Sequence, residues 1–203
     1  MKIIYSLMFL LLFVSYSFAQ SNSDLQAKVN KDTIPAVKER IPSTFGFKGF
    51  GYISTGVTED IGNGGGFGIN LRFNINKYFG IGVQGLYTNA QDKAYYHTTS
   101  NMFDTRLLLT FQKETAYNQK GLVPWLDLGM SVNTGVFSVS GAGSVTGVGV
   151  GFVIGAGLKY NFEKFYLGAS VDYNLAYISL YTRYSANIDP SALRINGELG
   201  WRF

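Results

Sequence analysis

The residues best suited to catalysis in this sequence are few. His97 is the one histidine of the 203-residue chain, and Ser100 follows three positions later. A catalytic serine needs a histidine base and a third group that orients the histidine. No third group accompanies this pair, so we interpret His97 as a solvated loop residue. One histidine and no cysteine also cannot supply the ligands of a structural metal site, and we expect no metal and no catalytic residue.

A glycine-rich segment has the spacing of a dinucleotide-binding loop. Gly80, Gly82 and Gly85 match that spacing, and Asp104 follows at about the distance where such loops have an acidic partner. In nucleotide-binding proteins this loop leads from a strand into a helix. Here the glycines lie inside a stretch in which apolar and polar residues alternate, which indicates a strand. We therefore expect no nucleotide and no other cofactor.

The composition excludes further classes of protein. Hydrophobic residues make up 46% of the chain and charged residues 15%, which is unlike a disordered protein. The formal charge is +4, and it falls to +3 if Lys2 is removed with a targeting segment. This charge is too small to indicate a nucleic acid partner. The unusual feature is an excess of both aromatic residues (16%) and glycine (25 residues).

The first 43 residues differ from the remainder. A basic Lys2, an apolar run from Ile3 to Val14 and small residues at Ser17 and Ala19 are typical of a secretory signal peptide cleaved near Ala19. The apolar run is shorter than the roughly 20 residues of a membrane-spanning helix. We predict a signal peptide at residues 1–19 and a polar periplasmic arm at residues 20–43, whose role stays open.

From Thr44 to Phe203 the apolar residues recur with a period of two, which is the pattern of strands. In residues 65–76 the odd positions from Phe67 onward are apolar, and the even positions are polar or glycine. The same alternation recurs in residues 147–161, 165–177 and 193–203, and more weakly in 79–87, 103–111 and 126–132. Thr44 to Val57 makes an eighth strand of ambiguous facing, because Phe45 and Phe47 lie on one face and Phe50 and Tyr52 on the other.

The polar faces decide between a soluble barrel and a membrane barrel. They carry nearly balanced charges and many glycines, whereas a soluble exterior would have roughly 25 to 35% charged residues. A membrane barrel instead has a polar interior and an apolar exterior. We therefore predict an all-β fold, an eight-stranded antiparallel transmembrane β-barrel at residues 44–203. Its interior would hold a structural charge network of Arg72, Asp104, Arg106, Asp127, Lys159, Asp172, Arg194, Glu198 and Arg202.

Aromatic residues gather where the strands are predicted to end. Membrane barrels carry aromatic girdles at both interfaces. We assign the girdle at the end of the termini to Phe79, Phe111, Trp125, Tyr160, Phe165, Trp201 and Phe203. Tight turns are expected at Asn76-Lys77 and Asn161 to Lys164, with a longer connection at Gln112 to Gly121. The outer loops are predicted at residues 58–64, 89–101, 134–146 and 182–190.

The segments INKYFGIGVQGLY, VGFVIGAGLKYNF and the terminal GELGWRF resemble the small outer-membrane β-barrels of Gram-negative bacteria, the porin-family or OmpA-like barrel domains, especially those of Bacteroidetes. The resemblance covers Thr44 to Phe203. It implies a location in the outer membrane, contact with its lipid, and insertion by the barrel-insertion machinery, which the terminal Trp201-x-Phe203 would signal. It does not settle a function, because members of this family differ in what they do.

Three functions are weighed on this basis. The first is a non-enzymatic structural, anchoring or partner-binding role through the outer loops and the N-terminal arm, with a protein partner that is not identified. The second is a narrow channel for ions or small solutes, which is less favoured because eight strands leave an interior just wide enough for side chains. The third is a lipid-modifying enzyme, which rests on His97 alone.

Overall fold

The computed structural model describes residues 41–55, 62–91, 99–117, 119–139, 143–181 and 186–203. The predicted signal peptide, nearly all of the predicted arm and His97 lie outside these residues. Within the described ranges there is no helix whose length and hydropathy would suit a membrane span.

The described chain is built from strands, and the first of them begins at Thr44. Their bounds are β1 (Thr44–Ser54), β2 (Gly64–Asn74), β3 (Phe79–Gln91), β4 (Thr99–Gln112), β5 (Gly121–Val139), β6 (Gly143–Phe162), β7 (Phe165–Leu180), β8 (Ala186–Ile188) and β9 (Ala192–Arg202).

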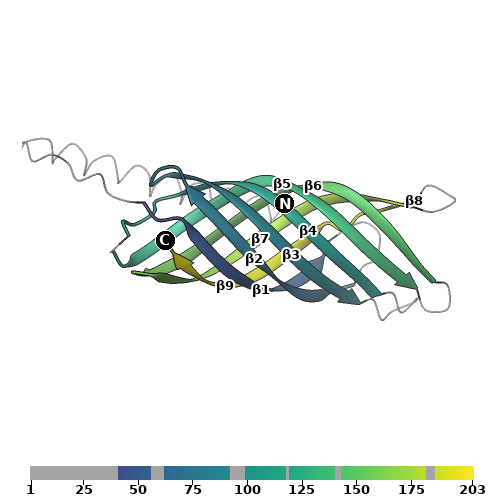
Figure 1. Cartoon of the computed structure of the whole chain (residues 1–203). Coiled ribbons are helices and arrows are strands. Elements are labelled where there is room, and N and C mark those ends of the chain that lie inside the picture. Colours follow the sequence, from purple (N-terminus) through teal and green to yellow (C-terminus); the bar gives the residue numbers. More distant parts are fainter. Residues whose placement is uncertain (1–40, 56–61, 92–98, 118, 140–142, 182–185) are drawn as a thin grey trace, which may run out of the picture. The chain divides into compact units, whose positions relative to one another are not determined.

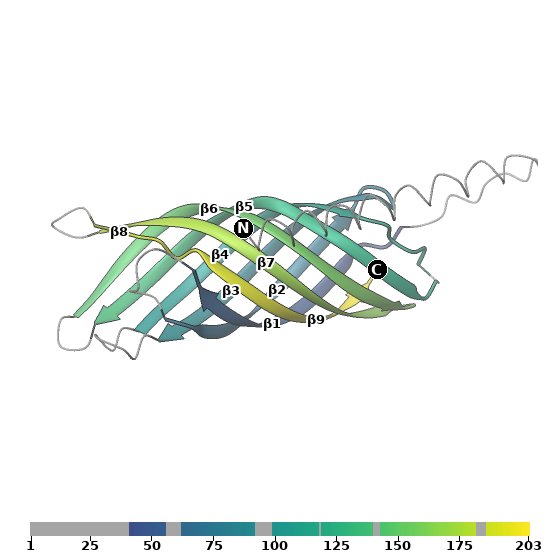
Figure 2. The same ribbon diagram turned by 180° about the vertical axis from the view of Figure 1, so that it is seen from behind.

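The strands form one closed antiparallel barrel (Figure 1, Figure 2). From β1 to β7 each strand pairs with the next. Strand β9 then pairs with β7 on one side and with β1 on the other, where Thr44 lies opposite Arg202. Since β8 only prolongs β9, the barrel has eight strands, and the predicted fold is confirmed.

Strands β8 and β9 are two parts of one strand. Ile188 lies opposite Ile178 and Ala192 opposite Asn174, so the register against β7 is the same before and after the break. Pro190 lies in the break and has no N–H to donate to a neighbouring strand. Ser191 compensates with its side chain, whose Oγ accepts a hydrogen bond of 3.1 Å from the backbone N–H of Ala176.

We call the end of the barrel that holds Thr44 and Arg202 the base. Its connection at residues 75–78 is a tight turn in which Asn76 Oδ1 accepts hydrogen bonds from the backbone N–H groups of Tyr78 and Phe79. A second tight turn joins β6 to β7 through Glu163 and Lys164, and Glu163 adopts a positive φ of 37°. The connection between β4 and β5 is longer, as predicted.

At the opposite end the strands run further than the sequence pattern predicted. Residues 89–91 and 99–101 belong to β3 and β4, and residues 134–139 and 143–146 belong to β5 and β6. The predicted outer loops at 89–101 and 134–146 were therefore too long. These segments are strands whose outward side chains are mostly polar, so their pattern is that of a loop.

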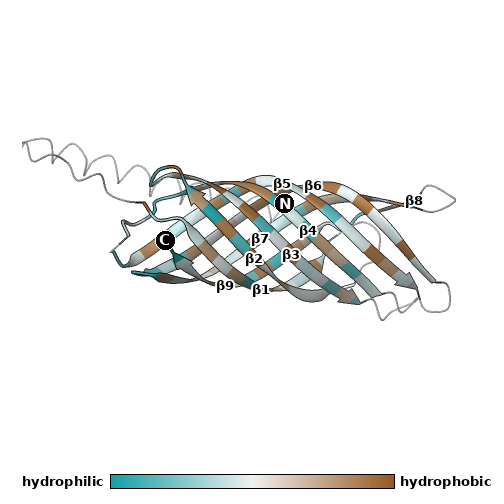
Figure 3. Cartoon of the chain, in the orientation of Figure 1, coloured by the Kyte–Doolittle hydropathy of each residue, from teal (hydrophilic) through white to brown (hydrophobic). Residues whose placement is uncertain are grey.

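The two faces of the wall differ in polarity. Met130, Phe67 and Val150 are more than 60% exposed on the outside, whereas Arg72, Arg106 and Arg194 are each 1% exposed inside. Figure 3 shows apolar and polar residues alternating along the strands. Strand β1 follows the same rule, because Phe47 and Ile53 are exposed while Phe50 and Tyr52 are buried. This is the arrangement of a barrel that spans a membrane.

Candidate functional site: the charged interior of the barrel

The interior of the barrel holds ion pairs along most of its length. All nine residues of the predicted charge network lie buried inside it. Two further charged residues that the sequence analysis missed, Lys48 and Glu114, are also buried there. Among the described residues the interior thus contains six cations, Lys48, Arg72, Arg106, Lys159, Arg194 and Arg202, and five carboxylates, Asp104, Glu114, Asp127, Asp172 and Glu198.

Two arginines and two aspartates form a cluster near the middle of the barrel. Arg106 Nη1 donates to Asp172 Oδ1 at 2.8 Å, and Arg106 Nη2 lies 3.6 Å from Asp104 Oδ2. Arg194 donates to Asp104 and lies 3.7 Å from Asp172. Each arginine therefore contacts both carboxylates. Because buried charges are costly unless they are paired, this shared pairing stabilises all four groups.

Trp125 lies inside the barrel, which corrects its predicted place in the aromatic girdle. Its side chain is 4% exposed, and its Nε1–H donates to Asp127 Oδ2 at 3.1 Å. Asp127 also pairs with Arg72 at 3.2 Å, and the Arg72 guanidinium lies 5.4 Å from the centre of the indole ring. Trp125 has the same parity as Asp127 along β5, and Leu126 has the opposite parity. Because side chains alternate between the two faces of a strand, Trp125 points inward. Its height along the barrel axis, which suggested the girdle, does not change this.

Gly157 of β6 makes room for this tryptophan. A Cβ atom at residue 157 would overlap the indole of Trp125 and the Cβ of Ser170 on β7. The glycine therefore allows a large ring to fit against the inner wall of a narrow barrel. Close approach explains this glycine, since its backbone conformation is an ordinary one.

Glu198 forms a separate cluster on β9. Tyr166 donates its hydroxyl hydrogen to Glu198, and Asn70 Nδ2 donates to Glu198 Oε1 at 2.6 Å. Lys48 Nζ lies 3.9 Å from Glu198 Oε2. A charge close to the end of the last strand is thus held by three strands other than its own.

Glu114 brings the connection between β4 and β5 into the base of the barrel. It accepts hydrogen bonds from Lys159 and Asn161, each at 2.6 Å, and lies 3.5 Å from Arg202. Arg202 also donates to the backbone oxygens of Thr115 and Ala116 and to that of Glu163 in the neighbouring turn. These contacts hold the long connection across the base.

The inward positions of Lys48 and Glu114 could have been predicted from the sequence to different degrees. Lys48 has the parity of Phe50 and Tyr52, so its inward position depended on the facing of β1, which the sequence left ambiguous. Glu114 lies beyond the end of β4, but it continues the inward parity of Thr110 and Gln112. Extending that parity past the end of the strand is the signal that would have found it.

The other six girdle residues lie at the base. Phe79, Tyr160, Phe165, Trp201 and Phe203 are between 42% and 50% exposed, and Phe111 is half-buried. Phe79 and Phe111 pack edge to face with ring centres 5.3 Å apart. Phe162, which the sequence analysis did not include, lies between Tyr160 and Phe165 and contacts both rings.

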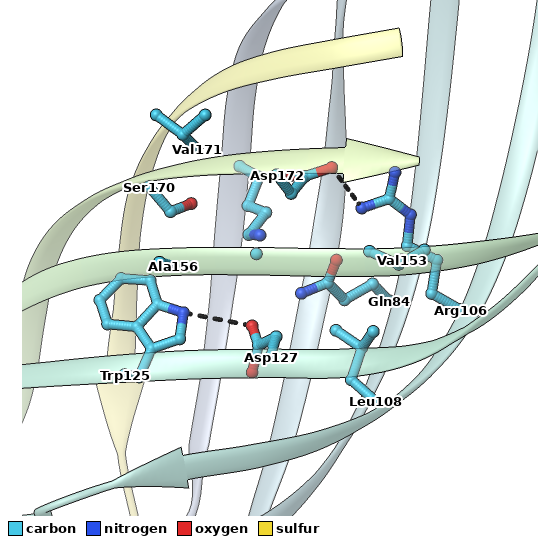
Figure 4. A pocket seen from close by; sticks show the side chains of 12 residues that line it. Gln84, Arg106, Leu108, Trp125, Asp127, Val153, Ala156, Ser170, Val171 and Asp172 are labelled. Carbon is cyan, nitrogen blue, oxygen red and sulfur yellow. Dashed lines mark hydrogen bonds and ion pairs between the residues drawn. The ribbon is translucent and has the colours of Figure 1, made fainter. Parts of the chain in front are cut away.

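A small cavity lies between the middle cluster and Asp127 (Figure 4). Its volume is about 10 Å³, which is close to the room of one water molecule. Gln84, Arg106, Trp125 and Asp172 line it together with Lys48. A space of this size admits no organic substrate, and side chains fill the interior around it.

The chemistry of this interior is that of fixed ion pairs. Among the residues that the structure describes, no cluster of three His, Cys, Asp or Glu side chains is arranged to hold a metal ion. Every carboxylate in the interior has a cationic partner within 4 Å. The arrangement can stabilise the barrel, and it can block the passage of solutes.

The chain is similar in structure to small outer-membrane barrels. OprG from Pseudomonas aeruginosa, an outer membrane protein, aligns with a TM-score of 0.62 at 13% identity and covers 83% of this chain and 99% of its own. Neisserial surface protein A aligns with a TM-score of 0.57 at 14% identity, covering 80% and 97%. Ail, the attachment invasion locus protein of Yersinia pestis, gives 0.50 at 17% identity, again with 80% and 97% covered.

No protein-family model and no curated protein matches the sequence. At these low identities the likeness to solved structures is one of fold. What the comparisons add is that closed eight-stranded barrels of this size are the architecture of outer-membrane proteins.

Proposed function

We propose that this chain is an integral outer-membrane protein of a Gram-negative bacterium, with a closed barrel and no enzymatic activity. It serves a structural, anchoring or partner-binding role through its outer loops and its N-terminal arm. The observation that carries this proposal is the combination of an apolar outer wall with an interior that ion pairs fill. Such a wall needs lipid around it, and the ion pairs inside support a barrel that is closed to solutes.

The remaining parts of the proposal come from the sequence. Residues 1–19 would direct export and be cleaved near Ala19, and residues 20–43 would lie in the periplasm. Recognition by the barrel-insertion machinery is supported by the terminal strand, in which Trp201 and Phe203 are exposed on the outside at the base. The likeness to Bacteroidetes barrels rests on the sequence segments alone.

Planar bilayer recording of the purified mature protein tests the closed interior. We expect no conductance steps in 1 M KCl under conditions in which a wide general porin, added as the control, gives regular steps. Incorporation of the protein into the bilayer is followed with a fluorescent label. An inserted protein that does not conduct is thereby distinguished from a protein that failed to insert.

The second function is a narrow channel, and the polar interior with its small cavity is what favours it. Regular steps with a constant ion selectivity would establish that function and overturn the closed barrel. Damage to the bilayer would instead give current steps that vary in size from one recording to the next. Such steps would persist after the protein is denatured.

A further inference from the structure

The strands of the barrel differ in length by more than a membrane requires. About 9 to 11 tilted residues cross the hydrocarbon of a bilayer. Strands β1 and β2 have 11 residues each, whereas β5 has 19, β6 has 20 and β7 has 16. Strand β9 also has 11 residues, but β8 continues it outward to Ala186. All strands reach the base, where the aromatic residues gather. The extra residues of β5, β6 and β7 therefore lie at the opposite end.

We call this extended end the crown; it comprises residues 88–91, 99–102, 133–139, 143–148 and 176–180. Its described interior side chains are uncharged, unlike those of the interior below it. Thr88, Ser100 and Asn133 are buried there, but most of the interior is apolar. Ala90, Met102, Phe137 and Ile178 of the crown are at most 4% exposed, and they form one cluster with Leu86 just below it. Phe50 and Tyr52 complete the cluster from β1, and their rings lie 5.5 Å above the Arg194 guanidinium. The interior thus changes near Arg194 from charged to uncharged and largely apolar.

The exterior of the crown is more polar than the exterior of the wall below it. Its outward positions carry hydroxyl and amide groups, namely Asn89, Gln91, Thr99, Asn101, Thr134, Ser138, Ser144, Thr146 and Ser179. Several of these groups bond to one another across strands, as Asn89 to Asn101 at 2.9 Å and Ser138 to Ser144 at 2.7 Å. Val136 and Val148 interrupt this surface, at 40% and 37% exposed, and Tyr177 adds one ring. None of these outward positions carries a charge.

A largely apolar interior with a mostly polar exterior is the arrangement of a barrel in water, and it is the reverse of the arrangement in the part of the barrel below the crown. We propose that the crown stands above the hydrocarbon of the membrane and that its neutral hydroxyl- and amide-bearing wall lies in the sugar layer of the surrounding lipopolysaccharide. The hydrocarbon then ends near Tyr87, whose hydroxyl donates to Asn101 at 2.7 Å. Sugars fit this wall because they exchange hydrogen bonds with uncharged groups. This inference rests on the proposed location in the outer membrane.

Cysteine labelling tests the proposal, since the chain has no cysteine of its own. Two matched pairs compare positions on one face of one strand: Thr134→Cys with Met130→Cys on β5, and Thr146→Cys with Val150→Cys on β6. Each variant is reconstituted in nanodiscs made with lipopolysaccharide that either carries or lacks its core sugars. Reaction with a charged maleimide is timed, and rates are normalised to those of the same variant unfolded in urea.

In sugar-free nanodiscs we expect residues 134 and 146 to react at least tenfold faster than residues 130 and 150. The core sugars should then slow labelling at 134 and 146 several-fold and leave 130 and 150 unchanged. Slow labelling at residues 134 and 146 in sugar-free nanodiscs would show that the crown lies in hydrocarbon. Equal labelling rates at these residues with and without the core sugars would show that the crown does not contact the sugars. Either result overturns the inference. Rapid labelling at 130 and 150 in a folded sample would instead overturn the membrane location itself.

Discussion

At the scale of single residues, the interior depends on charges that share partners. Asp104 contacts both Arg106 and Arg194 inside the barrel. Burial removes the hydration of these charges, so each depends on its partners for compensation. The exposed pair of Lys120 and Glu163 at the base, 3.4 Å apart, retains its hydration.

Asp104→Asn should therefore lower the free energy of unfolding by about 3 to 5 kcal/mol, because it leaves two buried arginines short of a negative charge. Urea unfolding of the protein in lipid vesicles, followed by far-ultraviolet circular dichroism, measures this change. Glu163→Gln is the control, and it should cost about 1 kcal/mol or less. Equal losses in the two variants would show that the interior ion pairs contribute no more than a surface pair.

Residue parity accounts both for what the sequence predicted and for its one error in the girdle. The nine predicted interior charges were chosen because they alternate with apolar residues, and all of them are buried. Trp125 was assigned by its level along the barrel instead, and it points inward like Asp127. A tryptophan in a polar interior is unexpected from hydropathy. Gly157 leaves room for its ring, and the Arg72 guanidinium lies over it.

At the scale of the strands, the sequence predicted their number and order and the facing of every strand except β1, but it did not predict their outer ends. The pattern used was apolar residues outside and polar residues inside, which holds only where lipid surrounds the wall. In residues 134–138 and 144–146 the outward side chains are Thr, Val and Ser, and one inward side chain is Phe137. The pattern therefore reverses and is that of a loop. The outer ends could not be predicted because the solvent around the strands changes there.

The facing of β7 supports a prediction for a single position. Val171 is 45% exposed on the outer wall, next to the buried Asp172. Val171→Arg should lower the free energy of unfolding in vesicles by about 2 to 4 kcal/mol, because the charge enters hydrocarbon near the midplane.

Thr134→Arg, in the crown, provides the comparison for Val171→Arg and should cost about 1 kcal/mol or less. Urea titration in the same vesicles gives both values. A loss at residue 134 as large as the loss at residue 171 would mean that both positions lie in lipid.

At the scale of the whole molecule, the barrel has no free edge along its main strands. Each of the eight long strands pairs with two others, so the backbone groups inside lipid are satisfied. Such a closed sheet opens only when an entire strand interface separates. We expect the folded protein to resist sodium dodecyl sulfate at room temperature and to migrate differently on a gel before and after boiling. Identical mobility in the two states would argue against a closed membrane barrel.

The pairing of β1 with β9 joins the two ends of the barrel sequence, since Thr44 lies opposite Arg202. All other neighbouring strands follow one another in the chain, apart from the short β8, and they can pair as hairpins as soon as they are made. The β1–β9 pair has by far the largest sequence separation, so its loop-closure entropy is the largest and it should form last. Until then β1 and β9 are open edges facing one another. The time between completion of the hairpins and closure of this seam is therefore when the chain is most exposed to pairing with another copy of itself.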